Sequence, residues 1–329
     1  MSDHSPLLLQ GELNHTPKNF FRFENFWVHM EGFKEVVQEA WNKPVQSQQP
    51  LKRLHIKMAR TAKAIKRWKK TKTGDTKLQL AIVKEIILRL ETAQEDRSLS
   101  QEELELLRRL KVRSVGLAMI EKSRIRQRSR LTYIRFGDAN TKFFQLRANS
   151  RKRKNFIQCL HTTNGPMFRH EDKEKVITDH FRQHLGTSTI RPATFHWPLL
   201  GYQQHDLSSL EAPFTQEEIK DTIFSMPSDK APGPDGFMGI FFKECREIIK
   251  YDLTAAFNQL HNLNAQHLSL LNSANIILIP KKLDAKHVGD YRPISLIHSF
   301  AKIFSKLLAN RLAPHLNRLV SNCQSDFIK

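Results

Sequence analysis

Three cationic side chains in the last third of the sequence stand beside short extended runs. Lys281 and Lys282 directly follow the apolar run Asn275-Ile-Ile-Leu-Ile-Pro280, and Arg292 directly precedes Pro293. A residue before proline is held in an extended backbone, and a guanidinium fork beside ammonium groups suits a polyphosphate or a nucleic-acid backbone. In a chain with a net charge of +20, isolated exposed basic residues are usually solvated charge, so these three alone favour that simpler interpretation.

A larger set of basic residues lies in the middle of the chain. Residues 108–154 contain 16 Lys or Arg against two acids, Glu121 and Asp138, and so hold +14 of the net charge of +20. Such an uneven excess predicts contact with a phosphate backbone, with counterion release as the driving force. We expect RNA or DNA to contact Arg124, Arg126, Arg128, Arg130, Arg151, Lys152, Arg153 and Lys154.

The first four of these arginines alternate along the sequence. On a helix, steps of two scatter around the cylinder, so the stretch is basic on more than one side. A simple solvated face would be one-sided. The pattern therefore favours nucleic-acid contact at this stretch, or disorder when nucleic acid is absent.

The basic residues are expected on a helical arm. Apolar residues at spacings of three and four predict helices over residues 51–70 and about 76–96, separated by Gly74-Asp75. Ser100 and Glu103 form a capping-box pattern that begins a third long helix, to about residue 130. Further helices are predicted over residues 171–185, from 215 to Pro227, within 237–262 and over 300–312.

The predicted strands are few and short. A strand at residues 156–160 is expected to turn at Asn164-Gly165 onto a second one. A strand at residues 276–279 is expected to pair with Tyr291-Arg-Pro-Ile-Ser295 through the polar residues 281–290. The fold class is therefore mainly α with a small β component.

The composition of two further stretches predicts ordered structure. Residues 1–50 hold no long periodic stretch, but their aromatic density predicts burial, which is favoured over stacking on nucleobases. Ala231-Pro-Gly-Pro-Asp-Gly236 should be a rigid, sharply shaped loop. This loop either holds a surface in fixed register or is an ordinary tight turn. The aromatic residues of the first stretch, 1–50, are Phe20, Phe21, Phe23, Phe26, Trp27, Phe33 and Trp41.

Composition argues against several classes of protein. Cys159, Cys245 and Cys323 are far apart, so neither a zinc site nor a disulfide framework is indicated, and a reducing compartment is expected. No apolar run approaches the length of about 20 residues that a membrane span needs. The first residues carry Asp3 and no basic segment, which argues against a secretory signal.

Four runs in one order resemble the fingers region of LINE-type reverse transcriptases from non-LTR retrotransposons. This resemblance covers residues 215–329, while residues 20–27 and 137–144 resemble the plant lineage of the same family. It implies a helical arm followed by a partial right-hand fingers subdomain. The four runs are Lys230-Ala-Pro-Gly-Pro-Asp-Gly236, Ile277-Leu-Ile-Pro-Lys-Lys282, Asp290-Tyr-Arg-Pro-Ile-Ser-Leu296 and Ala301-Lys-Ile-Phe-Ser-Lys-Leu-Leu-Ala-Asn-Arg-Leu312.

The resemblance also implies roles for particular residues. The positions matching Lys281 or Lys282 and Arg292 lie near the incoming nucleotide triphosphate or the template in that family. The helix that carries Lys302, Lys306 and Arg311 is implied to flank template RNA.

Ser2-Asp-His-Ser-Pro-Leu7 is similar to the last motif of the apurinic-type endonuclease that precedes the polymerase in these elements. There the residue matching His4 acts at the phosphate and the residue matching Asp3 orients it. The metal-binding acids of that nuclease are not in this sequence, so His4 is expected to be inert. At the other end, Asp326 stands where the family commonly has Ala.

The resemblance implies Mg²⁺ for the full-length family enzyme, held by palm carboxylates that clamp the reacting oxygens. No adjacent Asp pair occurs in this sequence. We therefore expect a fragment without cofactor or metal, truncated before the palm motifs and inactive alone as an RNA-directed DNA polymerase. The alternatives are a non-catalytic nucleic-acid-binding module and an inert product that does not fold fully.

These motifs also predict the partners and the location of the protein. We expect it to bind RNA and DNA rather than a membrane and to lie in the nucleus or the cytoplasm, and its oligomeric state is open. The segments are a nuclease remnant at 1–10, an aromatic-rich connector at 11–50, a basic helical arm at 51–155, an N-terminal extension and linker at 156–214, and partial fingers at 215–329.

Overall fold

The computed structural model describes residues 20–130, 141–186 and 205–320. These residues are mainly helical, with two small antiparallel sheets, as the sequence predicts. The chain divides into a smaller unit, built from residues 156–194 and 279–292 besides the first 20, and a larger unit that holds the rest. Asp3, His4 and Asp326 lie outside the described residues, and the predicted segment boundaries stay predictions.

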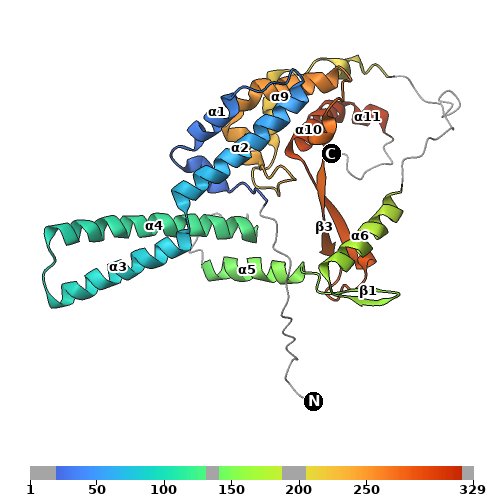
Figure 1. Cartoon of the computed structure of the whole chain (residues 1–329). Coiled ribbons are helices and arrows are strands. Elements are labelled where there is room, and N and C mark those ends of the chain that lie inside the picture. The colour runs from blue at the N-terminus through green and yellow to red at the C-terminus, as the bar shows by residue number, and fades with distance from the viewer. Residues whose placement is uncertain (1–19, 131–140, 187–204, 321–329) are drawn as a thin grey trace. The chain divides into compact units, whose positions relative to one another are not determined.

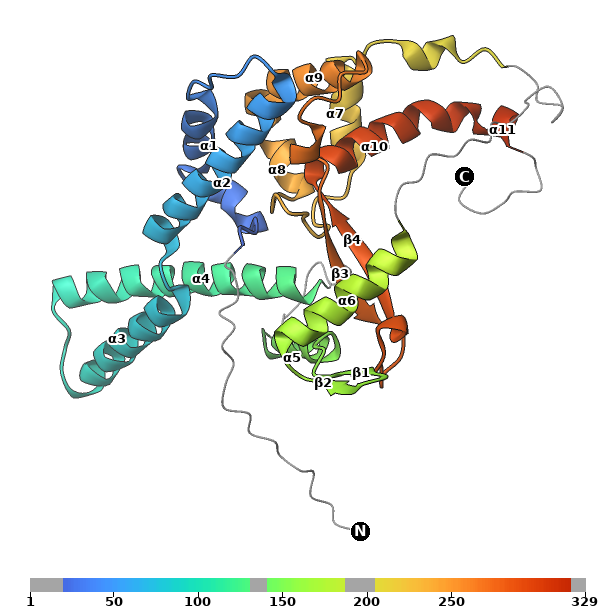
Figure 2. The ribbon, with the colours of Figure 1, turned by 45° about the vertical axis from the view of Figure 1, so that its right-hand side comes forward.

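The larger unit is organised around one apolar core. The helix α2, Pro50–Thr73, packs against α1, Phe33–Asn42, and against α9, Arg246–His261. Figures 1 and 2 show the other core helices beside α9. They are α7, Gln216–Ser225, α8, Gly239–Glu244, and α10, Ser299–Leu312, while short turns of helix lie at η1, Asn25–His29, η3, Ser208–Glu211, and η4, Leu268–Leu270.

Aromatic side chains from both ends of the sequence meet in this core. Phe23 packs edge-on against Trp27 and Phe241, at 5.2 and 5.7 Å between ring centroids. The predicted burial of the N-terminal aromatic residues is confirmed, since Phe23, Phe26, Trp27, Phe33 and Trp41 are buried and only Phe20 is well exposed among those described. Their burial removes the faces that stacking on nucleobases would need. Helix α1 was not predicted, because its ten residues are too short a window for clear periodicity.

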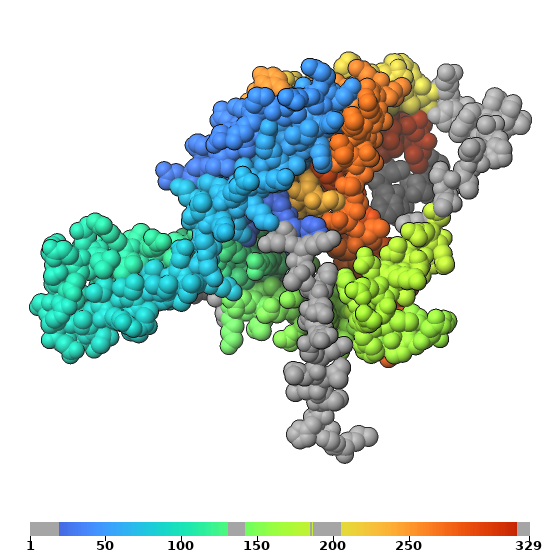
Figure 3. Space-filling model, in the orientation of Figure 1, coloured from blue at the N-terminus to red at the C-terminus, as the bar shows by residue number. Residues whose placement is uncertain are grey.

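The helical arm is confirmed in part. The helices α3, Thr76–Asp96, and α4, Gln101–Ser129, form an antiparallel hairpin that continues from the end of α2 (Figure 3). The first helix predicted for the arm, at residues 51–70, is instead α2, whose apolar face packs in the core. Asp75 caps α3, and Ser100 and Glu103 form the reciprocal capping box that the sequence predicts for α4.

A helix that the sequence did not predict follows the arm. The helix α5, Thr141–Lys154, packs against α4 and ends in the basic run of residues 151–154. Phe144 is buried, whereas Phe143 and Leu146 are exposed. The helix therefore has too narrow an apolar face to be recognised from periodicity.

The described residues of the smaller unit include a short sheet and the helix α6, His170–Leu185. Strands β1, Leu160–Thr162, and β2, Gly165–Met167, pair antiparallel, followed by α6. The predicted hairpin exists, but its first strand begins at residue 160 and not at 156. Within this unit the backbone N–H of His161 donates to the carbonyl of Lys286 at 2.8 Å.

The second sheet is a two-stranded ribbon, as predicted. Strands β3, Ala274–Pro280, and β4, Tyr291–Ile297, are joined through the short helical turn η5, Val288–Asp290. The ribbon runs through residues assigned to both units. After α10 the chain forms a turn at η6, Ala313–His315, and the four-residue helix α11, Leu316–Leu319.

The loop of residues 231–236 is locked into the core of the larger unit. Gly236 has φ +74°, and a Cβ placed there would lie 2.2 Å from the carbonyl oxygen of Phe21. A Cβ on Gly233 would lie 2.2 Å from the carbonyl oxygen of Ile297. Only glycine permits both close approaches. Through them the loop contacts the N-terminal aromatic segment and the residue before α10. Of the two alternatives, a loop that holds a surface in fixed register therefore fits better than an ordinary tight turn.

Candidate nucleic-acid interface

The C-terminal part of α4 and the helix α5 bring the two predicted groups of basic residues together. Arg151 of α5 donates from Nη1 to the backbone oxygen of Ser129, the last residue of α4, at 3.2 Å. No spacing rule predicts this contact from the sequence, because the two residues belong to different helices. The contact places the basic end of α5 against the basic end of α4.

Most of these basic side chains reach solvent. Arg128, Arg130, Lys152, Arg153 and Lys154 are exposed, and Arg126 and Arg151 are half-buried. Within residues 20–130, 141–186 and 205–320, no carboxylate forms an ion pair with any of these seven. Cations without acidic partners on two packed helices are arranged to attract a polyanion.

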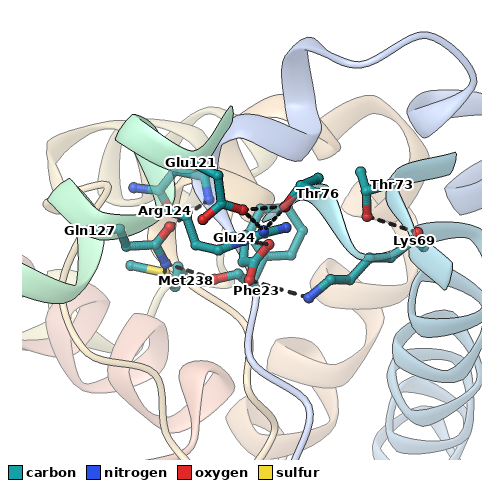
Figure 4. A network of polar contacts seen from close by, with 10 residues as sticks. Phe23, Glu24, Lys69, Thr73, Thr76, Glu121, Arg124, Gln127 and Met238 are labelled. Carbon is teal, nitrogen blue, oxygen red and sulfur yellow. Dashed lines mark hydrogen bonds and ion pairs between the residues drawn. The ribbon is translucent and has the colours of Figure 1, made fainter. Parts of the chain in front are cut away.

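Arg124 differs from its neighbours, because its guanidinium group is enclosed by partners (Figure 4). It forms ion pairs with Glu24 at 3.2 Å and with Glu121 at 2.5 Å, and it donates to the hydroxyl of Thr76 at 2.6 Å. It also lies 5.4 Å from the ring centroid of Phe26. These contacts use Arg124 to join α4 to α3 and to the aromatic segment, so the side chain is committed to packing.

Gln127 fixes the N-terminal segment beside the same part of α4. Its Nε2 donates to the backbone oxygen of Phe23 at 2.8 Å, and its Oε1 accepts from the backbone N–H of Asn25 at 2.9 Å. This pair of bonds holds Arg22, which is exposed, near the end of α4. Sequence reasoning missed Arg22, since nothing local separates it from other surface arginines.

The ribbon end carries the first predicted group of cations. Lys281 donates from Nζ to the backbone oxygen of Gly289 at 2.8 Å, and Lys282 pairs with Asp290 at 3.0 Å. Hydrogen bonds from the backbone of His287, from Lys282 and from the backbone of Lys286 hold the pKa of Asp290 far below its usual range. Arg292 is exposed, and no described residue forms a hydrogen bond or ion pair with its side chain.

Helix α10 presents one exposed cation and two that are engaged. Lys306 is exposed, whereas Lys302 donates to the backbone oxygen of Ala231 at 2.8 Å. Burial lowers the pKa of Lys302. Arg311 forms a two-bond pair with Glu218 at 2.6 and 2.7 Å and lies 4.2 Å from the ring centroid of Phe214. The carboxylate of Glu218 binds Arg311 and does not cap α7. The cap of α7 is the side chain of Thr215, which accepts from the backbone N–H of Glu218.

A buried polar group lies where the glycine-proline loop meets α10. The Asp235 side chain is 3% exposed, and its Oδ2 accepts from the backbone N–H of Ser299 at 3.3 Å. Its Oδ1 is buried without a hydrogen-bond partner among the described residues. Burial raises the pKa of Asp235 to about 6, and burial together with nearby positive charge lowers the pKa of His298 to about 4.

The described residues do not fit a magnesium site. In the described ranges, no three His, Cys, Asp or Glu side chains lie close enough together to hold a metal ion. The carboxylates of Asp235 and Asp290 accept hydrogen bonds from the backbone N–H groups of Ser299 and His287, respectively. No catalytic step through a metal is therefore derived from these residues.

Two proteins encoded by transposons have sequences related to this chain. Over 98% of its length the chain is 24% identical to a Xenopus laevis protein described as the transposon TX1 uncharacterized 149 kDa protein. Half of the chain is 29% identical to a Drosophila melanogaster protein described as a probable RNA-directed DNA polymerase from transposon BS. The chain is similar to transposon-encoded proteins. It spans 25% and 18% of the lengths of these two relatives, and no family model matches it.

Among the described residues, no helix is both long enough and apolar enough to cross a membrane.

Proposed function

We propose that this chain is part of a retrotransposon RNA-directed DNA polymerase of the LINE type, and that it binds nucleic acid through the basic surface of α4 and α5. The single observation that carries the binding proposal is a set of seven basic side chains without acidic partners among the described residues. The similarity to transposon-encoded proteins supports the polymerase context.

Charge type and position favour a phosphate backbone as the ligand. Arginine forks match phosphate oxygens in two-bond geometry, and lysines supply mobile point charges. The exposed run of residues 152–154 lies at the end of a helix, where the backbone carbonyls add negative potential that keeps the cations in place. The binding energy would come mainly from released counterions, so we expect little dependence on sequence.

The binding test measures affinity for a labelled oligonucleotide as a function of salt. We expect a steep linear fall of log affinity with log salt concentration, and replacing Lys152, Arg153 and Lys154 by Gln should lower the slope by about two to three units. The matched control replaces Lys63, Arg67 and Lys70, three exposed basic residues of α2, by Gln. Absence of binding at low salt, or equal effects of both triple variants, would contradict the proposal.

The fingers assignment extends the proposal to the ribbon and α10. Lys281, Lys282 and Arg292 would contact the nucleotide triphosphate or the template, and Lys306 would contact template RNA. Arg292 and Lys306 are the best placed of these, because both are exposed and neither has a polar partner among the described side chains. Arg292→Ala and Lys306→Ala should each lower affinity for a primer–template duplex more than Arg67→Ala does.

The polymerase chemistry itself is a separate question. We propose that the chain alone does not extend a primer, because its sequence contains no adjacent Asp pair and two-metal catalysis depends on paired carboxylates. The test supplies template, primer, nucleotides and Mg²⁺. Extension above the background of a heat-denatured sample would refute this part and leave the binding proposal intact.

A further inference from the structure

The end of α4 gathers three arginines that are far apart in the sequence. Arg130 ends the helix in a left-handed conformation with φ 55°. Arg151 reaches from α5 to the backbone oxygen of Ser129, the residue before Arg130. The two hydrogen bonds of Gln127, one helical turn before Arg130, hold the segment that carries Arg22. We call Arg22, Arg130 and Arg151 the three-arginine cluster.

The cluster is not neutralised from within the described residues. None of its three guanidinium groups forms an ion pair with a described carboxylate. Burial, then the positive charges of Arg151 and Arg22, lower the pKa of Arg130, and Asp229 is the acid that acts in the opposite direction. Like charges that the fold holds together are unfavourable in the free protein, and a bound anion would relieve this cost.

The backbone contacts show that the fold positions the three segments that carry these arginines. The guanidinium group of Arg151 is held by a carbonyl. The backbone of Arg22 lies next to a segment held by hydrogen bonds of 2.8 and 2.9 Å, and Arg130 is the capping residue at the end of α4. The arrangement contrasts with Arg124, where two carboxylates complete the site.

We propose that the three-arginine cluster binds one phosphate group of a nucleic-acid backbone, with guanidinium donors arriving from three separate segments. This inference rests on the nucleic-acid binding proposed above. A phosphodiester group fits because its two free oxygens each accept several hydrogen bonds and a planar guanidinium group can bind them in pairs. Asp229 limits the affinity, because its carboxylate lies near the phosphate position.

The experiment measures affinity of the full chain for a labelled single-stranded oligonucleotide at several salt concentrations. Arg22→Ala, Arg130→Ala and Arg151→Ala should each weaken binding about tenfold. The double variant Arg130→Ala with Arg151→Ala should lose less than the product of the single losses, because both residues serve the same phosphate. The salt slope should fall by about one unit in the single variants and little further in the double variant.

Two controls keep the inference falsifiable. Arg67→Ala removes an exposed arginine on α2 and should leave the affinity within about twofold. Asp229→Asn removes the opposing carboxylate and should tighten binding about threefold, an increase that misfolding cannot produce. The proposal is overturned if the affinity losses of Arg130→Ala and Arg151→Ala multiply in the double variant. It is also overturned if the single variants lose no more affinity than Arg67→Ala does, or if Asp229→Asn leaves the affinity unchanged.

Competition separates the backbone from free phosphate as the ligand. Inorganic pyrophosphate is added to the complex of the parent chain with the oligonucleotide at fixed ionic strength. We expect displacement only at millimolar concentrations, since a single subsite supplies a small part of the total affinity. Displacement at micromolar concentrations that disappears in Arg130→Ala would overturn the assignment to a backbone phosphate. Failure of the parent chain to bind any oligonucleotide would instead refute the proposed function, on which the cluster depends.

Discussion

Two arginines of α4 that lie one turn apart have opposite surroundings. Arg124 contacts Glu24, Glu121, Thr76 and the ring of Phe26. Arg128 is exposed and has no polar partner among the described side chains. The residue type and the helix are the same, so the difference comes from what the rest of the chain supplies. The first arginine serves the fold, and the second is free for a ligand.

Cations without an ion-pair partner indicate a binding surface better than the total charge of a segment does. Residues 108–154 carry +14, but that sum includes Arg124, whose charge is balanced by acids in and outside the segment. A balanced, partly buried pair adds little to the field at the surface, whereas exposed unpaired cations dominate it. The candidate interface is therefore smaller than the composition suggests and is centred on the end of α4 and on α5.

Removing the Arg124 side chain should destabilise the fold. Arg124→Ala removes an ion-pair partner from two carboxylates that are 13% and 11% exposed, Glu24 and Glu121. Glu24 keeps Lys69 at 3.2 Å, whereas no other cation among the described residues forms an ion pair with Glu121. Leaving Glu121 uncompensated should lower the free energy of unfolding by about 3 kcal/mol. Urea denaturation followed by circular dichroism measures the change.

Arg128→Ala is the matched control for that measurement. It removes the same side chain from the same helix, and alanine is a good helix former. We expect its free energy of unfolding to stay within about 0.5 kcal/mol of the parent. Equal losses in the two variants would show that the two arginines do not differ and would end the comparison.

The sequence predicted the elements well where the signals were local. The bounds of α3 and the capping box of α4 follow from Gly74-Asp75 and from Ser100 with Glu103, all within one turn of the helix ends. The helix α5 was missed because its apolar side chains are few and Phe144 alone of them is buried. Local patterns report local geometry, and α5 is held by contact with α4.

The candidate site was only partly predictable. The sequence named Arg130 and Arg151 but could not pair them, since their contact passes through the carbonyl of Ser129. Nor could it separate Arg124 from the others, because Glu24 lies 100 residues away. Arg22 was missed for the same reason. Tertiary partners decide which cation is available, and one sequence does not contain the distances between them.

Helix α10 repeats the contrast and offers a second test. Arg311 binds Glu218 through two bonds, donates to the backbone oxygens of Leu210 and Pro213, and stacks on Phe214. Arg311→Ala should lower the free energy of unfolding by about 2 kcal/mol, because charged hydrogen bonds are lost and carbonyls are left unpaired. Thermal and urea denaturation of the full chain measure it.

Lys306→Ala serves as the control on the same helix. Lys306 is exposed and has no polar partner among the described residues, so its replacement should change stability by less than about 0.5 kcal/mol. A destabilisation by Lys306→Ala as large as that of Arg311→Ala would mean that exposure does not distinguish packing residues from binding residues on α10.

Asp235 is a buried acid with incomplete pairing, in contrast to Arg124, whose guanidinium group is enclosed by partners. Burial raises its pKa from 3.8 to about 6, so between these values the folded state binds more protons than the unfolded state. Its contribution to stability is therefore fully present below pH 4 and is lost as the pH rises through about 6. Asp235→Asn should be more stable than the parent by about 2 kcal/mol at pH 7, with the difference vanishing toward pH 4.

The measurement is the free energy of unfolding in urea from pH 4 to pH 8. Asp221→Asn, at an exposed acid of α7, is the control and should leave the curve parallel to that of the parent. If Asp235→Asn is less stable than the parent at pH 7, the charged carboxylate of Asp235 is satisfied in the fold.

Removing the exposed Arg128 side chain should affect nucleic-acid binding and leave the fold intact. Arg128→Ala should weaken oligonucleotide binding about threefold and lower the salt slope by about one unit, because one exposed cation accounts for one phosphate contact at most. Arg124→Lys keeps the charge in the packed position and should leave the slope unchanged, since its partners are Glu24 and Glu121. Filter binding at four salt concentrations resolves a change of one unit. If Arg128→Ala leaves the slope intact while Arg124→Lys lowers it, the nucleic acid contacts the buried network, and the division between a packing arginine and a binding arginine must be reversed.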